Sequence, residues 1–193
     1  MATKLRWGIL GTGGIAKALA KALAVSTTGE LVAVGSRTQA AADTFGDEFK
    51  VARRYASYDG VLSDAGVDAV YISLPNHMHA EWAIKTAEAG KHVLCEKPLT
   101  TNWAEGLAVI EAARRAKVFF MEAFMYRCHP QTAKLVELLR SKVIGDVRVI
   151  QANFSYNMGP KYDNIRLRHD AAGGGIMDVG CYTVSMARLI AGA

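Results

Sequence analysis

The glycine-rich segment GTGGIA, which begins at Gly11, has the residue types and the spacing to bind a pyrophosphate. An apolar run precedes it and a helical pattern follows from about Ile15. In such a turn the first glycine permits a tight bend, the second lets the backbone approach the phosphates, and a small last residue lets the helix pack on the strand. The segment predicts a dinucleotide-binding turn of Gly11, Thr12, Gly13, Gly14, Ile15 and Ala16, with a plain glycine turn as the alternative. A P-loop is excluded because Gly14 stands where that motif requires lysine.

A second segment suited to a phosphate, Ser36-Arg37-Thr38, follows the next apolar run. Dinucleotide-binding folds often carry an acidic residue here, which binds the ribose 2′-hydroxyl. An arginine fork and two hydroxyls instead suit a 2′-phosphate, so Ser36 and Arg37 favour NADP over NAD. The alternative is that Arg37 covers the adenine face, which it would do with either cofactor.

The elements that must position these residues alternate between apolar runs and helical patterns through residues 1–125. We expect strands at residues 5–10, 30–35, 51–55, 68–74, 91–95 and 118–121, and helices from about residue 15 and at 39–49, 79–89 and 103–116. This order predicts an α/β Rossmann domain with a doubly wound parallel sheet. Ligands of such sheets bind at the carboxyl ends of the strands, where Pro75-Asn76 and Glu96-Lys97-Pro98 also fall.

The composition changes near residues 126–131, and a second, α+β domain is predicted over residues 126–193. Its expected elements are a helix at residues 130–141, a strand at 147–156 and a helix at 176–190. The strand is inferred from alternating residues, which are typical of a sheet with one solvated face.

Charge and cysteine usage exclude several classes of function. The net charge is +5, from 23 basic and 18 acidic residues that are scattered, which does not indicate nucleic-acid binding. The 3 cysteines form no disulfide framework or CxxC site. His77 and His79 could suggest a metal pair, but no cysteine or carboxylate completes a ligand set with them, so no metal is expected. No signal-peptide layout or bilayer-spanning run is present, which predicts a cytoplasmic protein without membrane contact.

Three motifs occur in order along the chain: GTGGIA, Glu96-Lys97-Pro98, and the glycine triplet Gly173 to Gly175 that leads to Asp178 and Tyr182. The set resembles the glucose–fructose oxidoreductase / inositol dehydrogenase family of nicotinamide-dependent oxidoreductases. The segment EAFMYRCHPQ, residues 122–131, is similar to its NADP-dependent xylose and dihydrodiol dehydrogenase members. The resemblance implies a homo-oligomeric NAD(P)-dependent dehydrogenase that acts on a hydroxyl carbon of a sugar, cyclic polyol or dihydrodiol.

The resemblance also implies roles for individual residues. Lys97 matches the catalytic lysine, Asp178 the acidic residue and Tyr182 the proton-transferring residue. Arg166 matches an arginine that follows a tryptophan in the family, although Ile165 precedes it here. The Lys97–Pro98 bond is expected to be cis. Further expected cofactor contacts are Leu74, Asn76, His79, Glu96, Lys97 and Arg166.

Elementary chemistry is consistent with these roles. Asp178 and Tyr182 lie four residues apart, so on a helix they share a face, and the preceding glycines allow a close approach to a cofactor. Oxidation of an alcohol requires a base, and an ammonium such as that of Lys97 lowers the pKa of a tyrosine from about 10. We therefore expect Tyr182 as acid/base, Lys97 as the group that tunes it and Asp178 as an orienting residue. The alternatives are that Tyr182 is a core aromatic, that Lys97 is a solvated loop lysine and that Asp178 complements the helix dipole.

The family's members are longer, so the resemblance implies a chain truncated after the Tyr182 helix. An apolar face of that helix would then lack part of its cover, which predicts association or poor solubility. The missing part of the substrate domain predicts weak or absent turnover. The alternative function is a non-catalytic nucleotide-binding protein or fragment that lacks a complete substrate domain.

Overall fold

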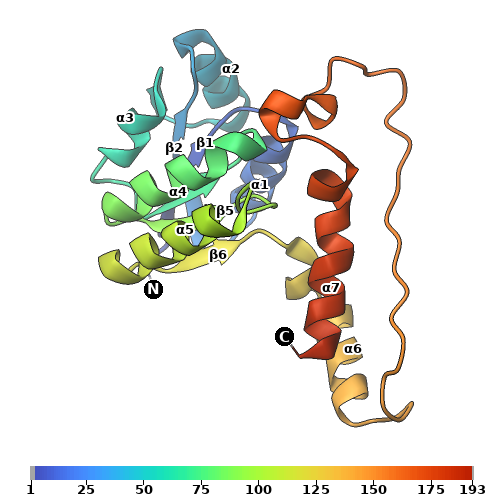
Figure 1. Ribbon diagram of the computed structural model, residues 1–193. Coiled ribbons are helices and arrows are strands. Elements are labelled where there is room, and N and C mark those ends of the chain that lie inside the picture. The colour runs from blue at the N-terminus through green and yellow to red at the C-terminus, as the bar shows by residue number, and fades with distance from the viewer. Residues whose placement is uncertain (1–2, 193) are drawn as a thin grey trace. The chain divides into compact units, whose positions relative to one another are not determined.

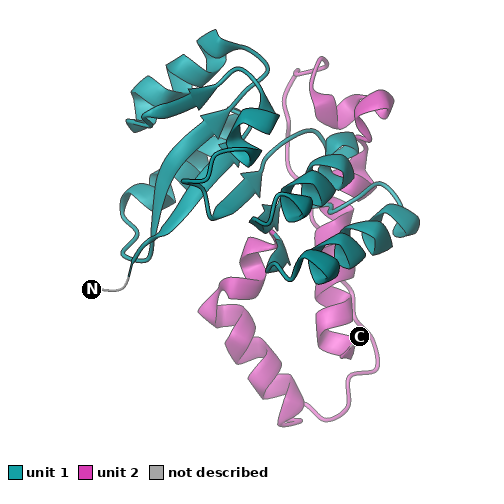
Figure 2. Ribbon diagram, turned by 90° about the vertical axis from the view of Figure 1, so that its left-hand side faces the viewer, with its two compact units in different colours: residues 1–122 teal, residues 123–193 magenta. Residues whose placement is uncertain are grey.

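The structure, a computed structural model, describes residues 3–192 and forms two compact units that divide between Glu122 and Ala123 (Figure 2). The first unit contains a six-stranded parallel sheet in the order β3-β2-β1-β4-β5-β6 (Figure 1). The predicted doubly wound α/β class is confirmed. The strands are β1 (Leu5–Leu10), β2 (Gly29–Gly35), β3 (Arg53–Tyr55), β4 (Ala69–Ile72), β5 (His92–Cys95) and β6 (Phe120–Glu122).

Five α-helices connect these strands: α1 (Gly14–Ala24), α2 (Gln39–Phe49), α3 (Tyr58–Leu62), α4 (His79–Glu88) and α5 (Trp103–Ala116). The helix α3 was not predicted, because five residues that include Gly60 are too few to show a helical period. It begins where the Ser57 hydroxyl accepts a hydrogen bond from the Gly60 N–H at 3.1 Å, a typical N-cap. The bounds of α2 and α5 coincide with the predicted helices.

A cluster of buried apolar residues in the first unit lies where α3, α4 and α5 pack on the sheet. All four residues of β4 are buried, and the Tyr58 and Trp82 rings meet edge to face at 4.9 Å. Burial of a large apolar side chain stabilises the folded state by about 1.5–3 kcal/mol. On the helix after the glycine turn, Ala16 is 0% exposed, so α1 packs close to the strands as the motif predicts.

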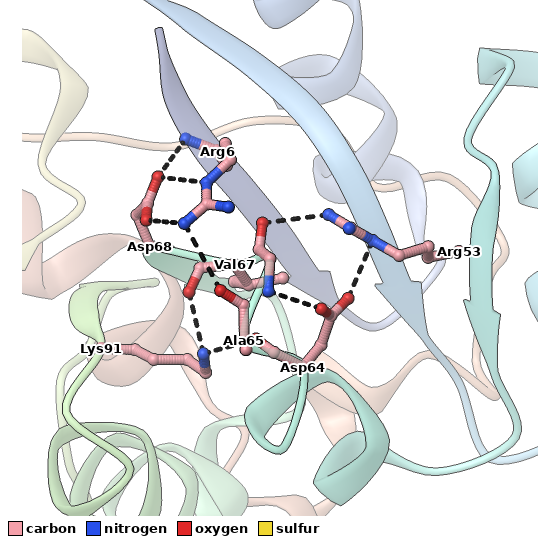
Figure 3. A network of polar contacts seen from close by, with 8 residues as sticks. Arg6, Arg53, Asp64, Ala65, Val67, Asp68 and Lys91 are labelled. Carbon is pink, nitrogen blue, oxygen red and sulfur yellow. Dashed lines mark hydrogen bonds and ion pairs between the residues drawn. The ribbon is translucent and has the colours of Figure 1, made fainter. Parts of the chain in front are cut away.

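The amino ends of the strands are joined by ion pairs and hydrogen bonds (Figure 3). Arg6, in β1, donates from its backbone N–H and from Nε to Asp68 Oδ2, both at 2.9 Å, and from Nη2 to Oδ1 at 2.5 Å. Asp68 immediately precedes β4, so this pair ties two central strands together at their start. The hydrogen bonds from Arg6 lower the pKa of Asp68 from 3.8 to about 2.

A second part of this network holds the loop between α3 and β4. The Asp64 carboxylate pairs with Arg53 Nε at 2.8 Å and accepts from the Tyr55 hydroxyl at 3.0 Å. The buried Lys91 ammonium donates to the carbonyl oxygens of Asp64 and Val67 at 2.7 and 2.8 Å. Burial lowers the pKa of Lys91, and the two carbonyls replace the water that the ammonium has lost.

The second unit contains helices but no strand within its described residues. The predicted strand at residues 147–156 is wrong: this segment is irregular, and residues 147–157 are all exposed. Alternation of side chains makes a strand only where a neighbouring strand supplies hydrogen bonds, and this unit supplies none. Its elements are 3-10 turns at Met125–Cys128, Ile165–Leu167 and His169–Ala171, a π-helical turn at Ile176–Gly180, and the helices α6 (Pro130–Arg140) and α7 (Cys181–Ala191).

None of the helices within residues 3–192 combines the length and the apolar character needed to cross a membrane.

We expect Asp68→Asn to lower the free energy of unfolding by about 1–2 kcal/mol at pH 7, a shift of about 2 pKa units discounted for partial exposure. The folded-state pKa of Asp68 lies below 3.8, so its contribution is present above that pH and disappears as the pH falls toward 2. Urea unfolding at pH 7 and pH 2.5 measures this. The difference in unfolding free energy between wild type and variant should be clearly smaller at pH 2.5 than at pH 7, and an unchanged difference contradicts the assignment. Asp47→Asn, whose side chain is 74% exposed, is the matched control and should change little.

Candidate functional site

The glycine turn after β1 needs a glycine at Gly11 for two reasons. Its φ of +97° is rarely adopted by other residues, and a Cβ there would lie 3.0 Å from both the carbonyl oxygen and Oγ of Ser73. The Gly11 N–H donates to the Gly35 carbonyl at 2.9 Å, and the Ser73 hydroxyl donates to the Leu10 carbonyl at 2.7 Å. The turn is therefore held between the ends of β2 and β4.

The next two glycines face open space. A Cβ at Gly13 or Gly14 would meet no atom of the described chain within 4 Å. Gly13 is the N-cap of α1 and provides no side-chain cap, and Ile15 is 48% exposed beside it. The amide groups of the first turn of α1 therefore remain available to an anion, and the space that two side chains would fill is left for it. These residues fit a dinucleotide pyrophosphate.

The residues of the segment Ser36-Arg37-Thr38, which follows β2, have different environments. Ser36 is 6% exposed, and its N–H donates to the Tyr55 carbonyl at 3.0 Å. The Thr38 hydroxyl accepts from the Ala41 N–H at 3.3 Å and caps α2. Arg37 lies exposed between them at the N-terminus of α2. Of Ser36 and Arg37, the two residues predicted to favour NADP, Arg37 is presented to solvent and Ser36 is buried.

His79 lies beneath the loops that follow β4 and β5. Its side chain is 0% exposed, with Nε2 2.8 Å from the Leu74 carbonyl oxygen and Nδ1 2.7 Å from the Pro98 carbonyl oxygen. Burial lowers the pKa of His79, and the two carbonyl contacts oppose this effect. The imidazole thus connects the loop that carries Asn76 to the loop that carries Lys97.

The loop that carries Lys97 is held by two residues that were not predicted from the sequence. The Tyr71 hydroxyl donates to Glu96 Oε1, and the Leu99 N–H donates to Glu122 Oε1 at 2.8 Å. The Lys97–Pro98 bond is cis, as the resemblance implied. A phenol within the otherwise aliphatic strand AVYI was the available signal for Tyr71, and a carboxylate at the end of β6 was the signal for Glu122.

In the second unit, Asp178 lies in the π-helical turn that leads to α7. Its Oδ1 accepts from Arg166 Nε at 2.9 Å, and its Oδ2 accepts from the Tyr156 hydroxyl at 2.5 Å. The Asp178 side chain is 14% exposed, and its bond to Tyr156 raises the pKa of that phenol. Tyr156 was not predicted as a site residue, since it lay within the expected strand.

In the glycine triplet before Asp178, Gly173 lets the backbone of Arg166 come close to the chain. A Cβ at Gly173 would lie 2.6 Å from the Arg166 carbonyl oxygen, which accepts from the Gly174 N–H at 2.7 Å. Gly174 has a φ of +111°, and a Cβ at Gly175 would meet no described atom within 4 Å. The triplet therefore brings the backbone of Arg166 to the start of the helix, and only its last two residues leave open space.

Tyr182 lies in the first turn of α7, and its ring belongs to an aromatic cluster. The ring centroids of Phe154 and Phe124 are 5.2 and 5.3 Å from it, and that of Tyr126 is 6.2 Å away. Its hydroxyl donates to Met125 Sδ at 3.3 Å. The cluster agrees with the alternative that Tyr182 is a core aromatic. The Met125 thioether, however, is a weak hydrogen-bond acceptor that a stronger acceptor can replace.

The first unit brings together four of the predicted segments, because they follow β1, β2, β4 and β5 at the carboxyl edge of one parallel sheet. The second unit brings Arg166 and Asp178 together and places Tyr182 one turn further along. Lys97 belongs to the first unit and Tyr182 to the second. Within residues 3–192 no group of three histidine, cysteine, aspartate or glutamate side chains is arranged to hold a metal ion.

A doubly wound parallel sheet with a glycine turn after its first strand defines the Rossmann class of proteins. Residues 5–124 match the family described as "Oxidoreductase family, NAD-binding Rossmann fold", and residues 132–193 match the GFO/IDH/MocA C-terminal domain. The chain belongs to the GFO/IDH/MocA oxidoreductase family, which is the resemblance inferred from its motifs.

Several relatives are named oxidoreductases. The chain is 46% identical to D-xylose 1-dehydrogenase (NADP(+)) 2 of Haloferax volcanii over 97% of its own length, and 35% identical to a trans-1,2-dihydrobenzene-1,2-diol dehydrogenase of Xenopus laevis over 98%. The crystal structure of KijD10, a 3-ketoreductase from Actinomadura kijaniata in complex with NADP and TDP-benzene, matches 98% of the chain with a TM-score of 0.89 and 34% identity. The chain spans 58%, 57% and 58% of these three proteins, respectively.

We expect the glycines of the turn to respond differently to substitution. Gly11→Ala should lower the free energy of unfolding by about 2–4 kcal/mol, from a disfavoured φ and contact with the Ser73 backbone. Gly13→Ala should cost less than about 1 kcal/mol, because its φ is −73° and its Cβ would meet open space. Urea unfolding of the two variants measures this difference, and equal losses would contradict the geometry of the turn.

Proposed function

We propose that the chain is an NADP-dependent oxidoreductase that transfers hydride between the nicotinamide and a hydroxyl carbon of a sugar, cyclic polyol or dihydrodiol. The observation that carries this proposal is the open space at Gly13 and Gly14, at an uncapped helix N-terminus beside the segment that presents Arg37. The names of the xylose and dihydrodiol dehydrogenases among the relatives support the choice of substrate class.

The cofactor would be held by the first turn of α1 at its pyrophosphate and by Arg37 at its 2′-phosphate. NADP is favoured over NAD because an arginine, rather than a carboxylate, follows β2. The NADP in the KijD10 complex and in the name of the Haloferax relative supports the same choice. When bound, NADP supplies the hydride acceptor or donor.

The chain's own residues would move the proton. Tyr182 takes the hydroxyl proton of the alcohol at Oη, or returns it in the reverse direction, in place of its contact with Met125. The Lys97 ammonium stabilises the phenolate and binds the reacting oxygen. Asp178 already accepts one hydrogen bond at each oxygen, which suits an orienting role better than that of a base.

A second candidate function is nucleotide binding without turnover. The observation in its favour is the irregular, exposed segment at residues 147–157, where a substrate-binding sheet would need a strand. We also propose that chains associate, because Ile176 and Val184 are 78% and 57% exposed on the last helical segment.

We expect NADPH to bind at least 10-fold more tightly than NADH in fluorescence titrations of the purified chain. Arg37→Ser should weaken NADPH binding by about 10–100-fold, the value of a charge-assisted bond, and leave NADH binding unchanged. Arg115→Ser, on the exposed surface of α5, is the matched control and should change neither affinity. Gly13→Ala should weaken both cofactors. Tighter binding of NADH, or no effect of Arg37→Ser, would contradict the proposed cofactor.

We expect Tyr182→Phe to lower substrate-dependent reduction of NADP by at least about 100-fold, the usual contribution of general acid–base catalysis, and to leave the Kd of NADPH within twofold. Tyr162→Phe, at a tyrosine that is 80% exposed, should retain full activity. Turnover retained in Tyr182→Phe would exclude the acid/base role. Wild-type chain that binds NADPH but turns over no aldose, polyol or dihydrodiol would favour the second candidate function.

A further inference from the structure

Residues 154–156 contact the last helical segment through side chains alone. The Phe154 ring lies 5.2 Å from the Tyr182 ring, and the Tyr156 hydroxyl donates to Asp178 Oδ2 at 2.5 Å. No backbone–backbone hydrogen bond involves residues 147–158, all of which the structure describes. The position of this segment within the second unit therefore depends on contacts such as these two.

The spacing of Phe154 and Tyr156 along the chain matches the spacing of their partners on the helix. Residues two apart in an extended chain point to the same face and are separated by about 6.6 Å. Asp178, in the π-helical turn, and Tyr182, in α7, are four residues and about one helical turn apart, which is about 6 Å along an α-helical axis and on the same side of it. Phe154 and Tyr156 therefore match Tyr182 and Asp178 in spacing, with the two segments running in opposite directions. The match gives a contact to Tyr182 and to Asp178, two of the three residues proposed for the reaction.

The Asp178 carboxylate is fixed from both sides by this arrangement. Arg166 Nε occupies Oδ1 at 2.9 Å and the Tyr156 hydroxyl occupies Oδ2, so rotation of the carboxylate would break both bonds. Tyr156 remains a donor over a wide pH range, because the carboxylate raises the pKa of its phenol.

We propose that Tyr156 is a positioning residue for the oxidoreductase reaction, which acts by holding Asp178 in one orientation together with Arg166. The inference rests on the proposed function, since Asp178 has a task only if the chain turns over an alcohol. Tyr156 contacts the carboxylate and needs no contact with the substrate.

The test is a double-mutant cycle on turnover with NADP. Tyr156→Phe keeps the ring and removes the hydroxyl, so kcat should fall about 10-fold while KM and the Kd of NADPH stay within threefold. In a chain that already carries Asp178→Asn, the same change should lower kcat by less than twofold, because its effect passes through the carboxylate. Tyr162→Phe is the matched control and should leave kcat unchanged in both backgrounds. Equal losses in the two backgrounds, or no loss in wild type, would overturn the proposal.

A second measurement separates this inference from the proposed function. Tyrosine labelled with ¹³C at Cζ reports the pKa of the Tyr156 phenol by NMR, assigned by its loss in Tyr156→Phe. That pKa should fall toward the ordinary value in Asp178→Asn, and an unchanged pKa would show that the contact is absent in solution. If wild type has no turnover although the pKa responds to Asp178→Asn, the proposed function fails, and the positioning role is overturned with it.

Discussion

The parallel pairing of β1 with β4 is the constraint on which the candidate site depends. After β1 the chain moves to one side to form β2 and β3, and it returns to the other side of β1 to form β4, β5 and β6. In doubly wound sheets ligands bind at the carboxyl ends of the two strands where the connections change direction, which here are β1 and β4. Gly11 and Ser73 meet at that point, and a side chain at Gly11 would separate the two strand ends. The backbone, rather than a particular polar side chain, creates the space for a ligand.

The parts of the fold that could be predicted are those whose signal is local. Apolar runs of β1 and β5 and the helical periods of α2 and α5 are dictated by neighbours in sequence, and the glycine turn has a fixed spacing. Contacts between distant residues carried no such signal. Tyr71 and Glu96 are 25 residues apart and Tyr156 and Asp178 are 22 apart, so these partners could be identified only after folding. The strand expected at residues 147–156 failed for the same reason, because alternation describes one segment whereas a strand requires a second.

Each of the two units fixes its proposed functional groups by different means. In the first, the loop of Lys97 is tied to rigid elements by Tyr71, Glu122 and the buried His79, so its backbone has little freedom. In the second, Asp178 is oriented by Tyr156 and Arg166, both from irregular or short segments that are exposed. Sites held by regular elements are more precise than those held by loops. The second unit is therefore where cofactor or substrate would add most order.

The edges of the sheet have a consequence for the behaviour of the chain in concentrated solution. Both edge strands, β3 and β6, are three residues long, and β3 carries Arg53 and Arg54. Short, charged edges offer little backbone for a second chain to pair with, which protects a sheet against ordered aggregation. The extended segment at residues 147–158 has unpaired backbone over a much greater length and exposes Val149 and Phe154. An extended, accessible chain is also the conformation that proteases bind, so limited digestion should cut here first and leave the sheet intact.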